Sequence, residues 1–408
     1  MKCRHCQAEV TLSFIDLGTA PPSNAYLTAA QLDGPEKWYP LRVLTCTECW
    51  LVQTQDYAHF EELFSNDYAY FSSYSDSWLR HAREYVAAMR QRFGLGSSSR
   101  VVEIAANDGY LLQYVRELGI PCLGIEPTAS TARAARERNI EIREEFFGLE
   151  CAERLAGDGW AADLMAANNV LAHVPDINDF VAGFARALKP SGVATFEFPH
   201  LMKLVADCQF DTIYHEHFSY LSLTAVARIF GRNGLVPFDV ERLPTHGGSL
   251  RVFAQRKDGG TRAESRSVQA LLAEEEAAGV ASAEYYAEFQ DRASDVKNRL
   301  LAFLVAARQR GDSVLAYGAA AKGNTLLNYA GVGPDLLACV VDRSPAKQGK
   351  YLPGSRIPIV DEEQLKRVRP DYVLILPWNL REEIEDQLSY VRSWGGRFVT
   401  AVPTLTIE

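Results

Sequence analysis

The segment "DTIYHEHFSY" contains several side chains that can exchange protons or bind a metal ion. It places Tyr214, His215, Glu216 and His217 in four consecutive positions, although the chain of 408 residues has only 8 histidines. In an extended segment the two histidines would point to one side, opposite the tyrosine and the glutamate. They could be metal ligands, surface residues or acid–base groups. We favour acid–base chemistry, because a histidine oriented by a glutamate is a common general base near neutral pH.

His173 adds a third imidazole to this hypothesis. It lies in "ANNVLAHVPD", after a predicted strand that ends with Asn168 and Asn169. The carboxyl ends of the strands form the edge at which doubly wound α/β folds bind ligands. We therefore expect the two asparagines beside a cofactor and His173 beside the reacting atoms.

The stretch "VVEIAANDGYLL" indicates a nucleotide-binding loop at the end of another predicted strand. The positions of an acidic-x-Gly-x-Gly loop are occupied by Glu103, Ala105, Asn107 and Gly109. Because two expected glycines are replaced, the loop does not match the GxGxxG pattern of dinucleotide-binding folds. Glu126 ends the next strand, where a carboxylate can accept hydrogen bonds from both ribose hydroxyls of an adenosine. These features favour S-adenosylmethionine over NAD, and a turn with capping residues only is the remaining alternative.

The stretch "DYAYFSSYSDSW" is rich in hydroxyl groups and precedes the first predicted helix of the same domain. It contains Tyr68, Tyr70 and Ser73. These side chains could belong to an ordinary core or surface. The functional alternative, which we carry forward, is a lid with Tyr68 near the substrate and Tyr70 and Ser73 near the cofactor.

The stretch "YGAAAKGNTLLN" follows a predicted strand and opens a predicted helix. Its small residues allow close approach of a ligand, and a helix N-terminus with Lys322 and Asn324 nearby favours an anion such as a diphosphate. It is not a Walker motif, because the glycine follows the lysine and no Ser or Thr comes directly after it. A packing turn of small residues is the alternative.

Two CxxC pairs near the N-terminus predict a metal centre. They are Cys3 with Cys6 and Cys46 with Cys49, separated by 39 residues. Four thiolates can bind one Zn²⁺ tetrahedrally, and such a site has no open coordination position for catalysis. We therefore expect structural zinc, with a redox motif as the alternative and His5 as a bystander.

The elements that must position these groups follow an α/β pattern. The region 1–70 has no long helical period and is expected to be a loop-rich zinc module. After an amphipathic helix at 77–93, short apolar runs alternate with helical stretches, which predicts a mostly parallel sheet with helices on both faces in a domain 71–262. Long helices at 263–310 lead into a second strand–helix series, so we expect a C-terminal Rossmann-like domain 263–408.

Composition narrows the class of protein. A net charge of −10 and a pI near 5.4 argue against a general nucleic-acid-binding protein. No apolar run approaches the length of a transmembrane helix, and "MKCRHCQAEV" lacks the apolar core of a signal peptide. We therefore expect a cytoplasmic protein without a membrane partner, in which thiols stay reduced, and we favour a monomer.

The order of the motifs along the chain resembles a known family. The zinc knuckles, "YFSSYS", "EIAANDGYLLQ", "NVLAHVPD", "YHEHFSYLS", "HGGSLRVF" and "YGAAAKGNTLLN" together resemble the C-methyltransferases of deoxysugar biosynthesis. The resemblance covers essentially the whole chain. It implies an N-terminal zinc module, a Rossmann-like S-adenosylmethionine domain and a C-terminal Rossmann-like domain. It also implies a dTDP-4-keto-deoxysugar substrate that is methylated at C3, although another ketone remains an alternative.

The resemblance also implies roles for individual residues. His217 would remove the C3 proton to give an enolate, with His173 near the enolate oxygen. Glu216 and Tyr214 would orient the base or the sugar, Tyr68 and Tyr70 would close the site, and His215 would face the substrate. Lys322 and Asn324 would hold the diphosphate. An NAD-dependent sugar-nucleotide oxidoreductase and a non-enzymatic zinc scaffold are the competing hypotheses.

Overall fold

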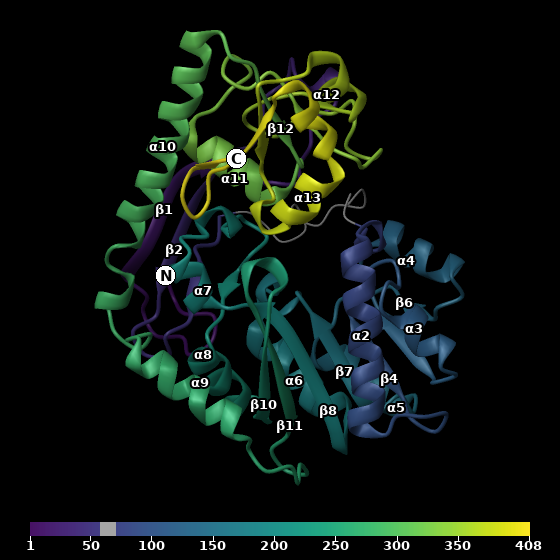
Figure 1. Cartoon of the computed structure of the whole chain (residues 1–408). Helices are drawn as coiled ribbons and strands as arrows, with labels where there is room; N and C mark the ends of the chain where they lie inside the picture. The colour runs from purple at the N-terminus through teal and green to yellow at the C-terminus, as the bar shows by residue number, and fades with distance from the viewer. Residues whose placement is uncertain (58–70) are drawn as a thin grey trace.

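The computed structural model describes residues 1–57 and 71–408. Within them the strands form three sheets of four, seven and six strands. The first belongs mainly to the N-terminal module, the second to the central domain and the third to the C-terminal domain. Figure 1 shows the long helix α10 (Phe289–Arg310) along one side of the molecule, next to the N-terminal strand β1 (Leu12–Ala20). No described helix is both long enough and apolar enough to cross a membrane.

The N-terminal module contains a small antiparallel sheet, and most of residues 1–57 lie in turns and loops. Its strands are β1, β2 (Tyr39–Thr45), β3 (Val52–Thr54) and β9 (Ser219–Tyr220). Two register shifts in the β1–β2 ladder break the alternation of apolar and polar residues by which a strand is recognised in sequence. The last strand comes from the central domain, so the module is completed by a segment distant in sequence.

The central sheet has the order β10-β11-β8-β7-β4-β5-β6, and its last five strands run parallel. The predicted strands are present. The strands are β4 (Val101–Ile104), β5 (Cys122–Ile125), β6 (Ile142–Arg143), β7 (Ala162–Asn168), β8 (Leu188–Pro199), β10 (Leu235–Leu243) and β11 (Ser249–Arg256). The first of these has four consecutive buried residues, as a strand covered on both faces requires.

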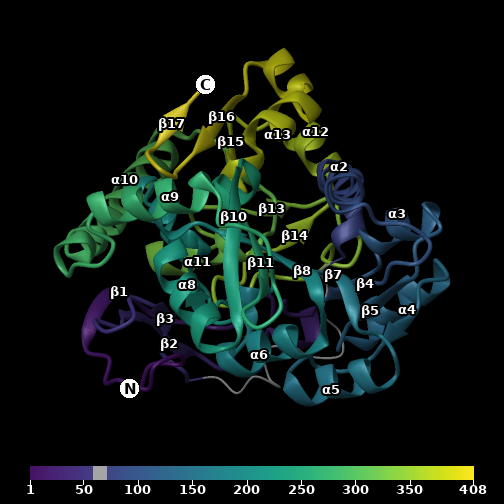
Figure 2. The same cartoon turned by 90° about the horizontal axis from the view of Figure 1, so that it is seen from below.

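Helices cover both faces of the central sheet. Figure 2 shows α2, α3 and α4 on the side of the molecule away from the N-terminal strands. Their apolar side chains form one core cluster, and those of α5, α6, α8 and α9 form another. The helices are α2 (Asp76–Phe93), α3 (Leu112–Glu117), α4 (Ala129–Glu137), α5 (Leu149–Gly157), α6 (Ile177–Ala187), α7 (Leu201–Ala206), α8 (Leu223–Arg232) and α9 (Arg266–Ala277).

The C-terminal domain has a six-stranded sheet in the order β14-β13-β12-β15-β16-β17. The predicted helix after "YVLILP" is split into α13 and a 3-10 segment. The strands are β12 (Val314–Tyr317), β13 (Val340–Val341), β14 (Ile359–Val360), β15 (Tyr372–Ile375), β16 (Arg397–Thr400) and β17 (Thr406–Ile407), and the helices are α11 (Ala321–Ala330), α12 (Glu363–Val368) and α13 (Arg381–Gln387). One core cluster joins this sheet to the N-terminal strands, where the rings of Phe14 and Phe289 stack at 4.3 Å.

Candidate active site

The segment Tyr214–His217 forms a tight turn, which we call the histidine turn. The backbone N–H of His217 donates to the carbonyl of Tyr214 at 2.9 Å. The segment is therefore a loop and not a short strand, so the two histidines do not share one side as they would in an extended segment. His215 points toward the N-terminal module, where its Nε2 lies 3.2 Å from the carbonyl of Pro40. His217 points elsewhere, because closing the turn rotates the two side chains apart.

His217 is held as a neutral base. Its Nδ1 lies 2.7 Å from the carbonyl of Thr212, and because a carbonyl can only accept, Nδ1 carries the proton and Nε2 keeps its lone pair. Burial lowers the pKa of His217 well below its usual range, and repulsion between two protonated rings, if His173 were charged as well, acts in the same direction. The ring lies 3.9 Å from that of Tyr214 and 4.5 Å from that of His173, measured between centroids. The arrangement can accept a proton at neutral pH.

His173 and Glu216 complete the polar group around this imidazole. Burial lowers the pKa of His173 to about 4, although a hydrogen bond to the backbone of Glu216 opposes this shift, so its ring is neutral. The carboxylate of Glu216 is 1% exposed, and both of its oxygens accept from the amide of Asn24, at 2.7 and 2.9 Å. The structure thus brings Tyr214, Glu216, His217 and His173 together.

His246 was missed from the sequence although it borders the same site. It has left-handed backbone angles, φ 54° and ψ 24°, which are uncommon outside glycine and asparagine. Its Nε2 lies 3.2 Å from the side-chain nitrogen of Asn169, and its ring lies 5.3 Å from that of Trp78. Burial and then the charge of Lys322 lower its pKa to about 4. A histidine directly before two glycines, after a proline, was the available signal in the sequence.

The loop after β4 has the geometry of a nucleotide cradle. Ala105, Asn107 and Gly109 all have positive φ, of 57°, 50° and 78°. The two residues that replace the expected glycines therefore still adopt the left-handed backbone. A Cβ at Gly109 would lie 2.3 Å from the terminal Cδ1 of Ile140, so another residue would displace that side chain and would also have to adopt a positive φ.

Two buried carboxylates line this cradle. Glu126 accepts from the backbone N–H groups of Asn107 and Thr128, both at 2.9 Å, which fixes its side chain at the loop. Glu103 is 1% exposed. Burial raises the pKa of both carboxyl groups, and a side-chain hydrogen bond with Tyr110 opposes the shift at Glu103. Both amide atoms of the mostly buried Asn168 lack a partner among the described residues. Such unsatisfied buried groups fit a site that receives hydrogen bonds from a bound adenosine cofactor.

Ser73 lies against the same loop. Its hydroxyl donates to Asp108 and accepts from Arg138 at 2.8 Å, and the preceding Ser72 N–H donates to Asn107 at 2.9 Å. These contacts place the segment that leads into α2 over the cradle. The other two predicted lid residues, Tyr68 and Tyr70, lie outside the described residues.

Lys322 lies near the site, since its charge lowers the pKa of His217 and His246, and Asn324 lies on the same helix, α11. The ammonium of Lys322 lies 2.5 Å from the amide oxygen of Asn379 and 4.8 Å from the ring centre of Trp378. Burial lowers its pKa, and Asp211 opposes that shift. Asn324 is 1% exposed, and both of its amide atoms lack a partner among the described residues. A diphosphate at these groups stays a prediction.

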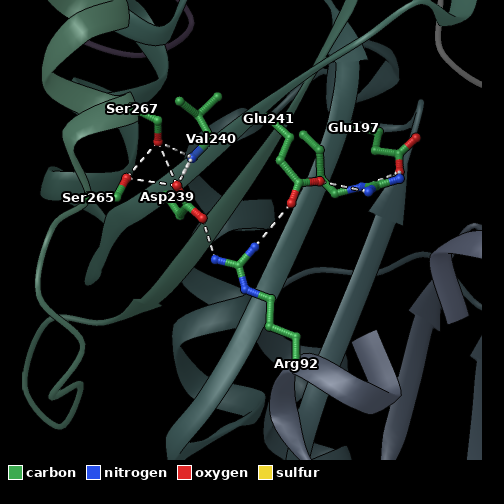
Figure 3. A network of polar contacts seen from close by, with 8 residues as sticks. Arg92, Glu197, Asp239, Val240, Glu241, Ser265 and Ser267 are labelled. Carbon is green, nitrogen blue, oxygen red and sulfur yellow. Dashed lines mark hydrogen bonds and ion pairs between the residues drawn. The ribbon is translucent and has the colours of Figure 1, made fainter. Parts of the chain in front are cut away.

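An ion-pair network stabilises the sheet beside the site. Glu197 is fully buried, and its carboxylate accepts from His81 at 2.8 Å and from Arg251 at 2.6 Å. Burial would raise the pKa of Glu197, but these hydrogen bonds and charges keep it below its usual range. Figure 3 shows how the chain of contacts continues through Glu241 to Arg92. No local pattern indicates this network, because its members lie on different elements.

The four predicted metal ligands converge. Their sulfur atoms all lie within 4.8 Å of one another, with Cys3–Cys49 and Cys6–Cys46 separations of 3.5 Å. A tetrahedral zinc site with Zn–S bonds of about 2.3 Å spaces its sulfurs by about 3.8 Å. The cluster therefore fits Zn²⁺. His5 is not part of it, because its Nδ1 lies 2.8 Å from the side-chain oxygen of Asn178.

Three family models match consecutive stretches of the chain. They are described as "Putative zinc binding domain" at residues 3–64, "Methyltransferase domain" at 78–239 and "C-methyltransferase C-terminal domain" at 244–403. Their order agrees with the cysteine cluster, the nucleotide cradle and the C-terminal sheet.

Two kinds of relative were found. The chain is 35% identical to the C-methyltransferase NovU of Streptomyces niveus over 98% of this chain and 95% of that protein. Among solved structures, the PH0226 protein of Pyrococcus horikoshii OT3 shares 15% identity with a TM-score of 0.39, covering 50% of this chain and 100% of its own. Magnesium protoporphyrin IX methyltransferase of Synechocystis PCC 6803 with bound SAM shares 16% identity with a TM-score of 0.34, covering 45% and 82%.

Proposed function

Because the chain belongs to the family of S-adenosylmethionine-dependent C-methyltransferases with an N-terminal zinc-binding domain, we propose that its substrate is a dTDP-4-keto-deoxysugar methylated at C3. C-methylation requires that a carbon atom of the substrate become nucleophilic. A sugar carbon does so when it loses a proton next to a carbonyl group. A 4-keto sugar offers such a proton at C3, so the site must contain a base for it.

The observation that carries the proposal is the state of His217. Its Nδ1–H is committed to the carbonyl of Thr212, so Nε2 is the atom that would take the C3 proton. The electron pair left on C3 would delocalise onto the C4 oxygen. We place the ring of His173, whose centre lies 4.5 Å from that of His217, near this oxygen, where a donor would be needed. Oriented donors at a developing oxyanion stabilise the transition state.

The remaining residues would hold the reactants in place. S-adenosylmethionine supplies an electrophilic methyl group when bound. Glu126 is placed to accept from its ribose hydroxyls, and the cradle at Asn107 and Gly109 lets the backbone approach it closely. We assign Glu103, Ala105, Ser73, Asn168 and Asn169 to the same cofactor pocket, and Tyr70 by sequence.

Substrate contacts are proposed on two sides of the site. Tyr214 and Glu216 lie on the histidine turn and would orient the sugar, with Tyr68 added by sequence. Lys322 and Asn324 would bind the diphosphate from the C-terminal domain, since an ammonium group and an unpaired amide suit phosphate oxygens. His215 faces Pro40 and is a weaker candidate for substrate contact than the sequence indicated.

We also propose the domain limits 1–70, 71–262 and 263–408, a monomer, and a cytoplasmic location that keeps the four thiols reduced.

The test is the mass of the product. The purified protein would be incubated with S-adenosylmethionine and a panel of dTDP-4-keto sugars, and one extra methyl group on a sugar carbon is the expected result. A panel in which no keto sugar gains a methyl group, while another ketone does, would refute the substrate class and keep the family. Thermal shifts with S-adenosylmethionine and NAD provide an independent check of the cofactor, because only the former should raise the melting temperature.

A further inference from the structure

The sheet of the zinc module ends directly on the histidine turn. Strand β3 pairs with β9, with Gln53 opposite Ser219, just after the turn. The next residue, Thr54, continues this pairing, since its N–H donates to the carbonyl of Phe218 at 3.0 Å. Its hydroxyl donates to the carbonyl of His217 at 2.6 Å. The backbone on which the base is mounted is therefore held by the module.

The module also reaches the turn through a second residue. Asn24 donates from one amide nitrogen to both carboxylate oxygens of Glu216. The residues around Asn24 are anchored on the C-terminal domain, because the hydroxyl of Tyr26 donates to the carbonyl of Ala319 at 2.7 Å and Ser23 lies 3.5 Å from Thr325 between hydroxyl oxygens. This anchoring fixes where the amide of Asn24 can point.

The metal centre is contacted by Gln53, which is the neighbour of Thr54 in the sequence. Gln53 is fully buried, and its amide nitrogen lies 3.3 Å from the sulfur of Cys3. Its amide oxygen accepts from the backbone N–H of Arg4 at 2.9 Å, and the guanidinium of Arg4 lies 4.7 Å from the ring centre of Phe218. Neighbouring residues of β3 thus touch a zinc ligand and the base.

We propose that Asn24 and Thr54 are positioning residues of methyl transfer, through which the zinc module sets the location of His217. The inference rests on the proposed role of His217 as the base. Displacing a reacting group by about 1 Å can cost about 10²-fold in rate. A carbonyl released from Thr54, or a carboxylate released from Asn24, would allow such a displacement while the buried thiolate cluster stays intact.

The cofactor cradle gives a built-in comparison. It is formed by the loop after β4 and by Glu126, and among the described residues its hydrogen bonds run to Ser72 and Ser73 rather than to Asn24 or Thr54. Loss of a positioning residue should therefore slow proton abstraction and leave cofactor affinity unchanged. General destabilisation of the fold would impair both.

The experiment uses the full-length, zinc-loaded protein with Thr54→Val, Thr54→Ser and Asn24→Ala. Thr19→Val is the control, because Thr19 is an exposed threonine on β1 of the same sheet. Three quantities are measured: deuterium exchange at the substrate carbon in D₂O without S-adenosylmethionine, the Kd for S-adenosylmethionine by calorimetry, and backbone amide exchange of a peptide spanning the histidine turn without substrate.

We expect Thr54→Val and Asn24→Ala to slow substrate exchange by about 10- to 100-fold. The Kd should stay within about twofold, and the amides of the turn should exchange faster in Thr54→Val. Thr54→Ser restores the hydroxyl and should recover most of the rate, and Thr19→Val should behave like the wild type.

Substrate exchange at the wild-type rate in both Thr54→Val and Asn24→Ala would overturn the inference, as would a Thr54→Ser variant as slow as Thr54→Val. If the wild type itself exchanges no substrate hydrogen, the proposed function fails instead. The amide-exchange arm then still decides the positioning claim, which an unchanged turn in Thr54→Val would refute.

Discussion

Replacing His217 by asparagine removes the proposed base and little else. The side-chain nitrogen of asparagine can occupy the position of Nδ1 and keep the 2.7 Å hydrogen bond to the carbonyl of Thr212. The group that disappears is Nε2, which carries the lone pair. The turn is also closed by a backbone hydrogen bond from His217 to Tyr214, and that bond does not depend on the side chain. The variant therefore isolates proton abstraction from the shape of the site.

The magnitude follows from the role of a general base. Such a base contributes about 10²- to 10⁴-fold, which is about 3 to 5 kcal/mol of transition-state stabilisation. We expect a loss near the middle of this range, about 10³-fold. The ring of His173, 4.5 Å from that of His217 between centroids, could take some of the protons and so limit the loss.

The assay is solvent deuterium exchange at the carbon next to the ketone, without S-adenosylmethionine, together with single-turnover methyl transfer. Both rates should fall by about 10³-fold in His217→Asn, with an unchanged Kd for the cofactor. His215→Asn is the matched comparison. Because His215 faces the carbonyl of Pro40, its loss should cost less than about tenfold.

Retention of a third or more of the wild-type exchange rate in His217→Asn would refute the assignment of the base. A large loss in His215→Asn with a small loss in His217→Asn would transfer the role to the other histidine. It would also mean that the turn opens when substrate binds.

Three further outcomes are expected. His246→Asn should lower turnover by about 10-fold or more with a nearly unchanged melting temperature, because asparagine tolerates the left-handed backbone but lacks the imidazole. The free energy of unfolding should decrease as the pH falls from about 6.5 toward 4. The pKa values of His173, His217 and His246 are lowered in the folded chain, so the unfolded chain binds more protons in this range. Denaturant titrations across the range measure the change, and a flat profile would contradict the buried neutral imidazoles. Gly109→Ala should destabilise the protein by about 2 to 4 kcal/mol and weaken cofactor binding. Gly119 has a similar positive φ but open space where a Cβ would lie, so Gly119→Ala should cost only about 1 to 2 kcal/mol. Equal losses in thermal unfolding would show that crowding at the cradle is unimportant.

Much of the fold could be predicted because buried parallel strands and amphipathic helices have strong local patterns. The run "VVEI" is buried at every position, and α2 begins at the expected place with Ser75 capping its N-terminus. The zinc site was predictable from spacing alone, since two CxxC pairs have few other uses in a reduced protein. The short helix α5 and strand β6 were missed because each is too brief to show a period.

The site was predictable in its residue types but not in its geometry. The histidine turn resembles an extended strand in sequence, and only the hydrogen bond from His217 to Tyr214 shows that the two imidazoles diverge. Asn24 lies in an ordinary Pro-Pro-Ser-Asn segment, and nothing local indicates that it contacts Glu216. Contacts between residues so distant in sequence are decided by tertiary packing, which local patterns do not encode.

Because β3 pairs with β9, the N-terminal sheet is completed only by a strand that is synthesised much later. Ser219 follows Thr54 by 165 positions (219 − 54), so at about 5–20 residues per second the ribosome adds it roughly 10–30 s later. During this interval the cysteines of the module are already synthesised, while β3 has no partner on its outer edge. Unpaired strand edges favour aggregation, so the nascent chain has a vulnerable period that ends only when the histidine turn is synthesised. The segment that carries the proposed base thus also protects the newly made N-terminal sheet.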